Sequence, residues 1–381
     1  MVLACPVSVP YVRHSERPAH WWIGRALRGL ADASGLGPSD IDGLCASSFT
    51  LGPDTAVALT QHFGLTTRWL DHLPMGGAAG IIALRRAARA VQAGDAEVVA
   101  CVAGDTHGGS SFSDLIAGFS RFSQDAVLPY GAGGPNASFA LITREIMRRY
   151  GLGREAFGKL CVAQRHNALH YGKALMKKPL SLEDYLAGRP IADPITLFDC
   201  VMPCAGAEGF LVLREERAVD LGLPFARILS TQERHNAWPD DTVQYRCGWA
   251  LDSERFWSAA GVGPDDVDLV QTYDDYPAIV AMQWVDLGFT SADAIADFID
   301  RHSFTFDGSF PHNTSGGQLS VGQAGAAGGW LGLNEALRQV TGAGADNQVS
   351  DARIACVSGF GMINYDRGLC STAALIAGGR S

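Results

Sequence analysis

Apolar and polar positions in the first part of the chain follow two different spacings. Residues 22–34 and 81–93 have apolar positions at helical spacing, and both segments carry arginines on their polar faces. Residues 96–104 are mostly apolar, which is typical of a buried strand, and residues 41–49 follow a turn at 38–40 and also indicate a strand. Strands that alternate with helices predict an α/β protein with a largely parallel sheet covered on both faces.

Two stretches of the chain repeat one another. Residues 77–104 and residues 325–359 both begin with GAAG, continue into a helix that contains Ala-Leu-Arg, pass through a polar loop and end in a strand with Ala-Cys-Val-x-Gly. The second stretch is longer by seven residues, which the polar loop can absorb. Matched features in the same order indicate a duplicated fold.

The middle of the chain, about residues 107–235, is rich in glycine, proline and serine. We predict long loops there, and long loops inside a compact enzyme usually build a site or cover one.

Composition narrows the class of partner. The chain has 381 residues, 47% hydrophobic residues and only 18% charged residues, which is enough apolar sequence for a large core. Its net charge is −10 and it has no run of lysine or arginine, so we expect no nucleic-acid partner. No apolar run reaches the ~18 residues of a membrane span. The first residues are too short and too broken by proline for a signal peptide, and we expect a cytoplasmic protein without a membrane partner.

Nine cysteines are scattered along the chain without metal-ligand spacing. We interpret them as reduced, mostly buried thiols of a cytosolic protein and expect no metal site.

The stretch LPMGGAAGII, residues 73–82, is either a reaction centre without a reactive group or only a packing motif. A glycine-rich turn opens onto a helix of small residues, as where backbone must pass close to a ligand, yet the stretch contains no serine, cysteine, lysine or histidine.

Four segments resemble the thiolase superfamily, and the resemblance covers nearly the whole chain. They are HNTSGGQLSVGQAGAAGG (312–329), ACVSGFGMINYDRGLCSTAALI (355–376), SLEDYLAGRPIADPITLFDC (181–200) and TYDDYPAIVAMQWVDLGF (272–289). The resemblance implies two βαβαβαββ halves in a five-layer αβαβα sandwich with an inserted loop region at about 107–200, and a homodimer. We place the two halves at residues 1–230 and 231–381.

The catalytic positions of that family fall on unusual residues here. The nucleophilic cysteine corresponds to Gly77, the activating histidine to Gln323, and the His or Asn of the H-D-x-F or N-E-x-F segment to Tyr273. Cys356 matches the second cysteine, although it also occupies the strand position of the repeat. Glycine cannot form an acyl-enzyme and glutamine cannot act as a base, so we do not expect ping-pong thiolysis.

The chain is similar to thiolase-like retro-aldolases that cleave steroid side chains, which lack the cysteine and use tyrosines. One of their tyrosines corresponds to Tyr273 and the other to Gln323. The resemblance implies a carbon–carbon lyase on a β-hydroxyacyl-CoA, with backbone N–H groups at Gly77 holding the thioester oxygen. A non-catalytic acyl-CoA-binding scaffold and an acyltransferase with another nucleophile are the alternatives.

Further residues complete the set of candidates. His312 could supply a missing base. Asp274 or Asp275 could orient Tyr273, and His107 could reach the substrate. Asn313, Gly316 and Gly317 could let the loop approach the catalytic helix. A second group of residues could contact a bulky substrate or a dimer partner: Phe112, Phe119, Phe122, Tyr365 and Arg367. We expect coenzyme A only as part of the substrate, with no other cofactor. The resemblance also implies a small OB-fold, zinc-ribbon partner protein.

Overall fold

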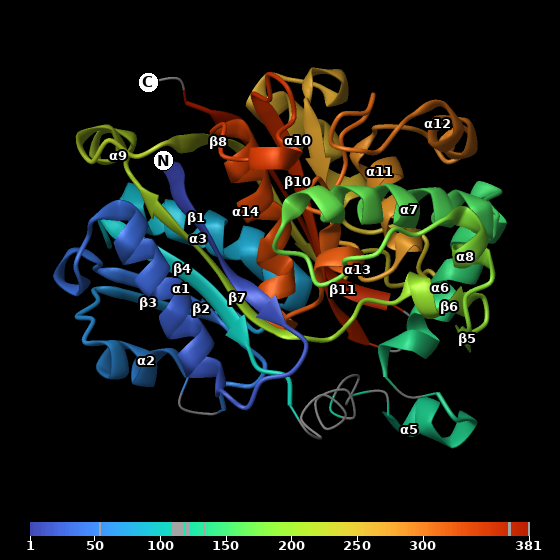
Figure 1. Cartoon of the computed structure of the whole chain (residues 1–381), viewed down its shortest axis with the longest axis horizontal. Coiled ribbons are helices and arrows are strands. Elements are labelled where there is room, and N and C mark those ends of the chain that lie inside the picture. The colour runs from blue at the N-terminus through green and yellow to red at the C-terminus, as the bar shows by residue number, and fades with distance from the viewer. Residues whose placement is uncertain are drawn as a thin grey trace.

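The computed structural model describes residues 1–52, 55–108, 118, 122, 124–132, 134–364 and 367–379, and its two halves have similar orders of elements (Figure 1). The first half contains β1 (Val2–Val12), α1 (Ala19–Ser34), β2 (Gly43–Ser47), α2 (Thr55–Phe63), β3 (Trp69–His72), α3 (Ala79–Ala93), β4 (Val98–Asp105) and β7 (Ala205–Leu213). The second half contains β8 (Phe225–His235), α10 (Trp249–Ala260), β9 (Leu269–Gln271), α11 (Pro277–Leu287), α14 (Gly328–Val340), β10 (Ile354–Asn364) and β11 (Arg367–Gly378). The order in the first half is βαβαβαββ, as the resemblance implied.

The strands form one hydrogen-bonded sheet in the order β3-β2-β4-β7-β1-β8-β11-β10-β9. The five strands of the first half and the four of the second mirror each other about the β1–β8 junction, where residues 2–4 pair antiparallel with residues 225–227. A single bridge between Val270 and His312 stands where the second half would have its counterpart of β3. The division at residue 230 stays a prediction; that residue lies within β8.

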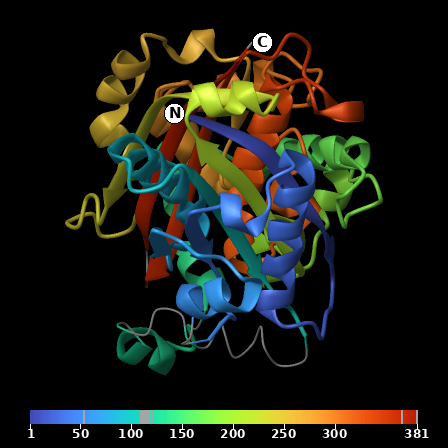
Figure 2. The same cartoon turned by 90° about the vertical axis from the view of Figure 1, so that its left-hand side faces the viewer.

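Helices α3 and α14 lie side by side between the two half-sheets and form the middle layer of the predicted five (Figures 1 and 2). Helix α3 contacts β2, β4 and β7 on one side and β8, β10 and β11 on the other. On the outer faces α1 covers the first half-sheet, and α10 packs on β8 and β11. The central core consists largely of small or branched side chains of these two helices, with the fully buried Trp330 among them.

The two central helices approach each other closely enough to require glycine. A β-carbon at Gly80 would lie 2.3 Å from the carbonyl oxygen of Gly329, and one at Gly329 would lie 2.7 Å from the α-carbon of Gly77. These are contacts between backbones, which cannot move aside as a flexible side chain can. The repeated glycine motif therefore sets the separation of the two half-sheets.

The insertion between β4 and β7 is more helical than the sequence indicated. The prediction of loop is wrong over residues 135–171, because α6 (Pro135–Tyr150) and α7 (Arg154–Tyr171) fill most of that range. Proline is tolerated in the first turn of α6, where its missing N–H has no partner to lose, and Gly151 ends the helix in a left-handed conformation. Glycine and proline thus mark helix ends here. The remaining short elements are α5 (Gln124–Val127), α8 (Leu182–Leu186), β5 (Pro190–Ala192), β6 (Ile195–Thr196), α9 (Glu215–Asp220), α12 (Ile295–Arg301) and α13 (Gly317–Val321).

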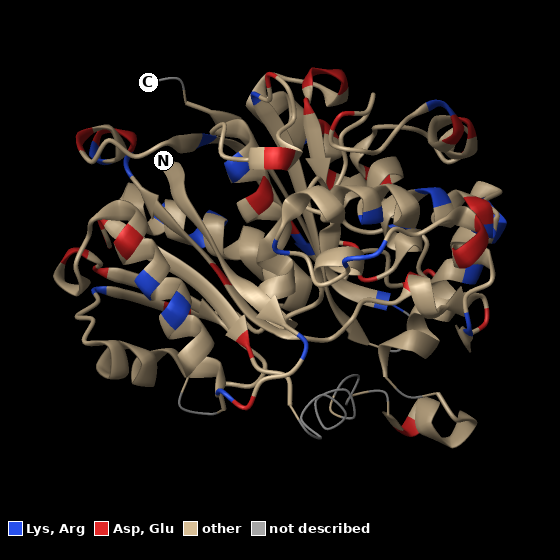
Figure 3. Cartoon of the chain, in the orientation of Figure 1, with Lys and Arg blue, Asp and Glu red and all other residues tan. Residues whose placement is uncertain are grey.

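Charged side chains lie mostly at the periphery, and the central strands and helices carry few of them (Figure 3). Among the described residues, no helix is long and apolar enough to span a bilayer.

We predict that Gly80→Ala destabilises the protein by ~2 kcal/mol or more, because the new methyl group would collide with backbone. Alanine forms helix better than glycine by ~1 kcal/mol, so without the collision the substitution would stabilise the protein. Chemical denaturation measures the free energy of unfolding of the variant and the wild type. Gly263→Ala is the matched control, since Gly263 has φ −117° and its β-carbon would meet nothing closer than 3.8 Å. Equal stability of the two variants would contradict the close approach of α3 and α14.

Candidate active site

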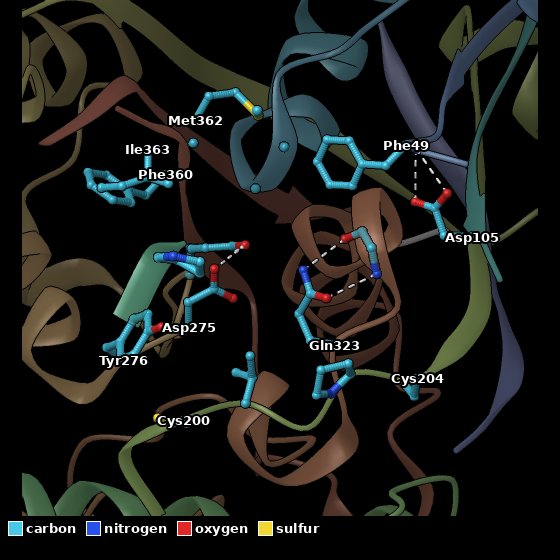
Figure 4. Close-up of a pocket in the computed structure, with 18 of the residues that line it drawn as sticks. Phe49, Asp105, Cys200, Cys204, Asp275, Tyr276, Gln323, Phe360, Met362 and Ile363 are labelled. Carbon is cyan, nitrogen blue, oxygen red and sulfur yellow. Dashed lines mark hydrogen bonds between the residues drawn. The ribbon is translucent and has the colours of Figure 1, made fainter. Parts of the chain in front are cut away.

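A cavity of about 300 Å³ opens where the two halves meet the insertion. In Figure 4, Asp275, Tyr276 and Phe360 lie on one side of it, and Gln323, Phe49 and Asp105 lie on the other. Of the residues predicted for the site, Gly77, Tyr273, Gln323 and His107 line this cavity. Their catalytic and binding roles stay predictions.

Gly77 sits in the short 3-10 turn, residues Gly76–Ala78, that leads into α3. A β-carbon on Gly77 would lie 2.1 Å from Cε2 of Tyr273 and 2.3 Å from the carbonyl oxygen of Phe360. The tyrosine ring therefore occupies the space that a side chain at position 77 would need. The glycine makes room for Tyr273 rather than for substrate.

The hydroxyl of Tyr273 donates a 2.8 Å hydrogen bond to Oδ2 of Asp275. The backbone N–H of Tyr273 donates to the carbonyl of Ser358 at 3.1 Å, which fixes this extended segment against β10. In extended backbone, residues two apart point to the same face. Tyr273 and Asp275 therefore both reach the cavity, and Asp274 between them turns away from it.

Burial dominates the protonation of this pair. It raises the pKa of Asp275 to about 7; the hydrogen bond from Tyr273 opposes the rise and the neighbouring Asp274 adds to it. Burial and then the charge of Asp275 raise the pKa of Tyr273 well above its usual value. Oδ1 of Asp275 has no hydrogen-bond partner in the described part of the chain. The pair thus combines a carboxylate poised near neutrality with a protonated phenol, the two groups that acid–base catalysis needs.

Gln323 is held by its own turn on the opposite wall. Its side-chain amide exchanges two 3.1 Å hydrogen bonds with the backbone of Gly325. Its backbone N–H donates to Met202, and its carbonyl accepts from Cys204. These contacts fix Gln323 between the insertion and the start of α14.

Asp105, at the end of β4, is a fully enclosed carboxylate that holds loops of both halves. It accepts hydrogen bonds from Ser48, from the backbone of Phe49 and Thr50, and from the N–H of Ala326, the last at 2.7 Å. His107 follows two residues later and stacks on His14 with ring centroids 5.3 Å apart. Burial, followed by His14 and Arg13, lowers the pKa of His107.

Cys356 does not line the cavity, and the structure contradicts its candidacy for the site. It lies on β10 with no exposed surface, paired with Leu375, and burial raises the pKa of its thiol far above the usual range. A thiol that stays protonated is a poor nucleophile. Cys356 is a core residue.

His312 and Asn313 also lie outside the cavity. His312 is fully buried, bonds Thr272 Oγ1 at 2.7 Å and packs edge-on against Trp284. Burial lowers its pKa to about 3, so it stays neutral and would be a weak base. The side chain of Asn313 accepts a hydrogen bond from the N–H of Thr272 at 2.8 Å. Both residues replace strand pairing at the incomplete edge of the second half.

Gly316, Gly317 and Asp274 form a structural turn beside α7. Gly316 has φ 103° and Gly317 has φ 59°, and β-carbons there would lie 2.5 Å from Ala168 and 2.1 Å from Asp274. Asp274 accepts hydrogen bonds from Gln318 N, Leu319 N and the side chain of Gln164. The hydrogen bonds of the Asp274 side chain therefore hold this turn and are not made with Tyr273.

Asp275 and Asn136 both line the cavity; the sequence raised Asp275 only as an alternative to Asp274 and did not raise Asn136. Asp275 could have been found from the alternation of faces around Tyr273. For Asn136 no local pattern gives a signal. Phe122 is fully exposed, and Arg367 donates to the backbone carbonyls of Trp238, Pro239 and Asp241. Phe112, Phe119 and Tyr365 lie outside the described residues.

Comparison with known proteins places the chain among thiolase-like sequences. Residues 231–370 match the family described as thiolase C-terminal domain-like. The chain is 30% identical to the "Steroid side-chain-cleaving aldolase" of Thermomonospora curvata, over 88% of each protein. It is 29% identical to the "17-hydroxy-3-oxo-4-pregnene-20-carboxyl-CoA lyase" of Mycobacterium tuberculosis, over 88% of this chain and 90% of that one.

Two solved structures share the fold. The "Ltp2-ChsH2(DUF35) aldolase" matches with a TM-score of 0.83 and 26% identity, over 100% of this chain and 98% of that one. A monomeric SCP2-thiolase-like protein type 1 from Mycobacterium smegmatis matches with a TM-score of 0.75 and 15% identity, over 100% and 77%. The second match concerns the fold alone.

We predict that Asp275→Asn changes how stability depends on pH. The folded pKa of Asp275, about 7, exceeds the unfolded value of ~4. Its stabilising contribution is therefore complete below ~pH 4 and is lost as the pH rises through the folded pKa. Relative to the variant, the wild type should lose free energy of unfolding between ~pH 5 and ~pH 8, as chemical denaturation would show. Asp265→Asn, at an exposed carboxylate, should leave the wild-type profile unchanged. Parallel curves for wild type and Asp275→Asn would contradict the buried carboxyl.

Proposed function

The chain belongs to the thiolase superfamily, in the branch that contains the steroid side-chain-cleaving aldolase, and we propose that it is an acyl-CoA lyase that performs retro-aldol cleavage. One observation carries the proposal: the ring of Tyr273 fills the space beside Gly77, and its hydroxyl bonds Asp275 inside the cavity. Gly77 takes the place of the family's nucleophile, so the chemistry is non-covalent.

Retro-aldol cleavage of a β-hydroxyacyl-CoA needs a base, an enolate-stabilising group and an acid. In our proposal Asp275 takes the proton of the β-hydroxyl. The electrons of that O–H bond form the new carbonyl, and the broken carbon–carbon bond leaves its electrons on the thioester enolate. Backbone N–H groups at Gly77 hold the enolate oxygen.

Tyr273 then protonates the enolate carbon, and Asp275 returns its proton to the phenolate along their 2.8 Å hydrogen bond. The hydroxyl proton is thereby balanced by the proton on the released acyl-CoA, and no oxidant or reductant is consumed. Coenzyme A takes part only as the substrate's carrier.

A bulky apolar acyl group suits the walls of the cavity. Much of the lining is apolar, and Phe139 stacks on Tyr276 with ring centroids 4.1 Å apart. The names of the two relatives point to steroid acyl-CoA esters, and we extend this substrate class to the chain.

We further propose a protein partner and a homodimer. The similar solved structure named "Ltp2-ChsH2(DUF35) aldolase" combines an aldolase with a DUF35 protein. We infer that this chain binds a partner of that kind, the small OB-fold, zinc-ribbon protein expected from the sequence. The homodimer rests on the resemblance, and the cytoplasmic location rests on the interpretation of the nine cysteines as reduced thiols.

We predict that Tyr273→Phe lowers turnover of 17-hydroxy-3-oxo-4-pregnene-20-carboxyl-CoA by ~10²- to 10⁴-fold, because the variant lacks the acid. Release of propionyl-CoA is the measurement, with and without the DUF35 partner. The melting temperature should change little, since the ring remains. Tyr150→Phe is the matched control, because that hydroxyl donates to the carbonyl of Tyr245 away from the cavity.

Full activity of Tyr273→Phe would overturn the assignment of the acid. If the wild type cleaves no CoA ester under either condition but binds the partner tightly, the scaffold alternative holds. An acyl adduct in the intact mass of the protein would instead establish an acyltransferase.

We predict that kcat/KM of the wild type rises with pH up to about 7, the raised pKa of Asp275, because only the ionised carboxylate can accept the hydroxyl proton. The residual activity of Asp275→Asn should lack this acidic limb. An unchanged limb in that variant would assign the titration to another group.

A further inference from the structure

Asn136 lines the same cavity from the first turn of α6 and has a fixed orientation. Its Oδ1 accepts a hydrogen bond from the hydroxyl of Tyr276 at 2.6 Å. The thiol of Cys200 lies 3.9 Å from the same oxygen and 3.5 Å from the carbonyl of Thr196, so in this orientation the oxygen of the amide faces both groups. Its nitrogen must therefore point away from Tyr276 and Cys200.

The Nδ2 group of Asn136 has no acceptor among the residues that the structure describes. A side-chain amide carries two donor hydrogens there. A donor without a protein acceptor on the wall of a cavity is available to an oxygen of a bound ligand. The geometry thus leaves a directed donor on the cavity wall.

The same contacts tie Asn136 to the proposed base. Tyr276 directly follows Asp275, and its ring stacks on Phe139, one turn beyond Asn136 on α6. Tyr276 is therefore held by both its ring and its hydroxyl. The distance between the amide of Asn136 and the Tyr273–Asp275 segment is consequently set by rigid contacts.

On the basis of the proposed function, we propose that Asn136 is a substrate-binding residue that donates Nδ2–H to the β-oxygen of the acyl-CoA. The donor holds this oxygen while Asp275 removes its proton, and it keeps the bond as the oxygen becomes a carbonyl. Asn136 would thus select acyl groups that carry an oxygen at the β-carbon.

The experiment compares binding of two ligands to Tyr273→Phe, which retains the ring and lets the intact substrate be titrated. The ligands are 17-hydroxy-3-oxo-4-pregnene-20-carboxyl-CoA and its 17-deoxy analogue. We expect Tyr273→Phe to bind the hydroxylated ester ~10-fold more tightly, and Tyr273→Phe/Asn136→Ala to bind the two esters equally. Tyr273→Phe/Tyr276→Phe keeps the stacked ring but frees the amide, and should lose part of the preference.

The outcomes separate this proposal from the proposed function. Wild-type cleavage together with an undiminished hydroxyl preference in the Asn136→Ala double variant would overturn the role of Asn136 and leave the lyase intact. If the Asn136→Ala double variant lost the same affinity for both esters, the role of Asn136 would also be overturned, because a purely structural residue would have that effect. Both proposals would be overturned if the wild type bound neither ester and did not cleave the hydroxylated one. Melting temperatures confirm that each variant is folded.

Discussion

The contact between the backbones of α3 and α14 is the constraint on which the architecture depends. The two helices form the only layer that touches both half-sheets among the described elements, so their separation fixes how the halves meet. Gly77, Gly80 and Gly329 allow an approach that any β-carbon would prevent. The same approach brings the N-terminal turn of α3 beside the turn before α14. The walls of the cavity are therefore placed by the packing that holds the molecule together.

This packing also decides which chemistry the site can hold. Position 77 has space for a side chain only if the ring of Tyr273 is elsewhere, because the two would overlap by more than an ångström relative to ordinary van der Waals contact. A nucleophile at position 77 and a tyrosine in this orientation exclude each other sterically. In our proposal, the absence of the family's nucleophile at position 77 and the presence of the phenol beside it are one structural change. In our proposal this change converts an acyl-transfer site into a site for proton transfer.

The sequence predicted the features that depend on local pattern or on resemblance. The repeat of residues 77–104 and 325–359 led to the duplicated fold, and the aligned motifs led to the cavity positions of Gly77, Tyr273 and Gln323. It could not distinguish Asp275 from Asp274, because which face of an extended segment is enclosed depends on the long-range hydrogen bond to Ser358. Cys356 and His312 were misplaced for a related reason. The local sequence pattern is similar for buried strand residues and for cavity residues, and only the tertiary packing distinguishes the two kinds of position.

The buried carboxylates show how that separation can be made from structure. Asp105 receives five donors from four residues, and Asp274 receives three, so their lone pairs are engaged in holding loops. Asp275 receives one donor among the described residues, the hydroxyl of Tyr273. A carboxylate with many donors is stabilised as an anion and gains little from another proton, whereas a poorly solvated one near neutrality can accept it. Burial raises the pKa of both Asp274 and Asp275, and the donors to Asp274 oppose this rise. Of these three aspartates, Asp275 has the fewest hydrogen-bond donors among the described residues, and its carboxylate can therefore accept a proton most readily.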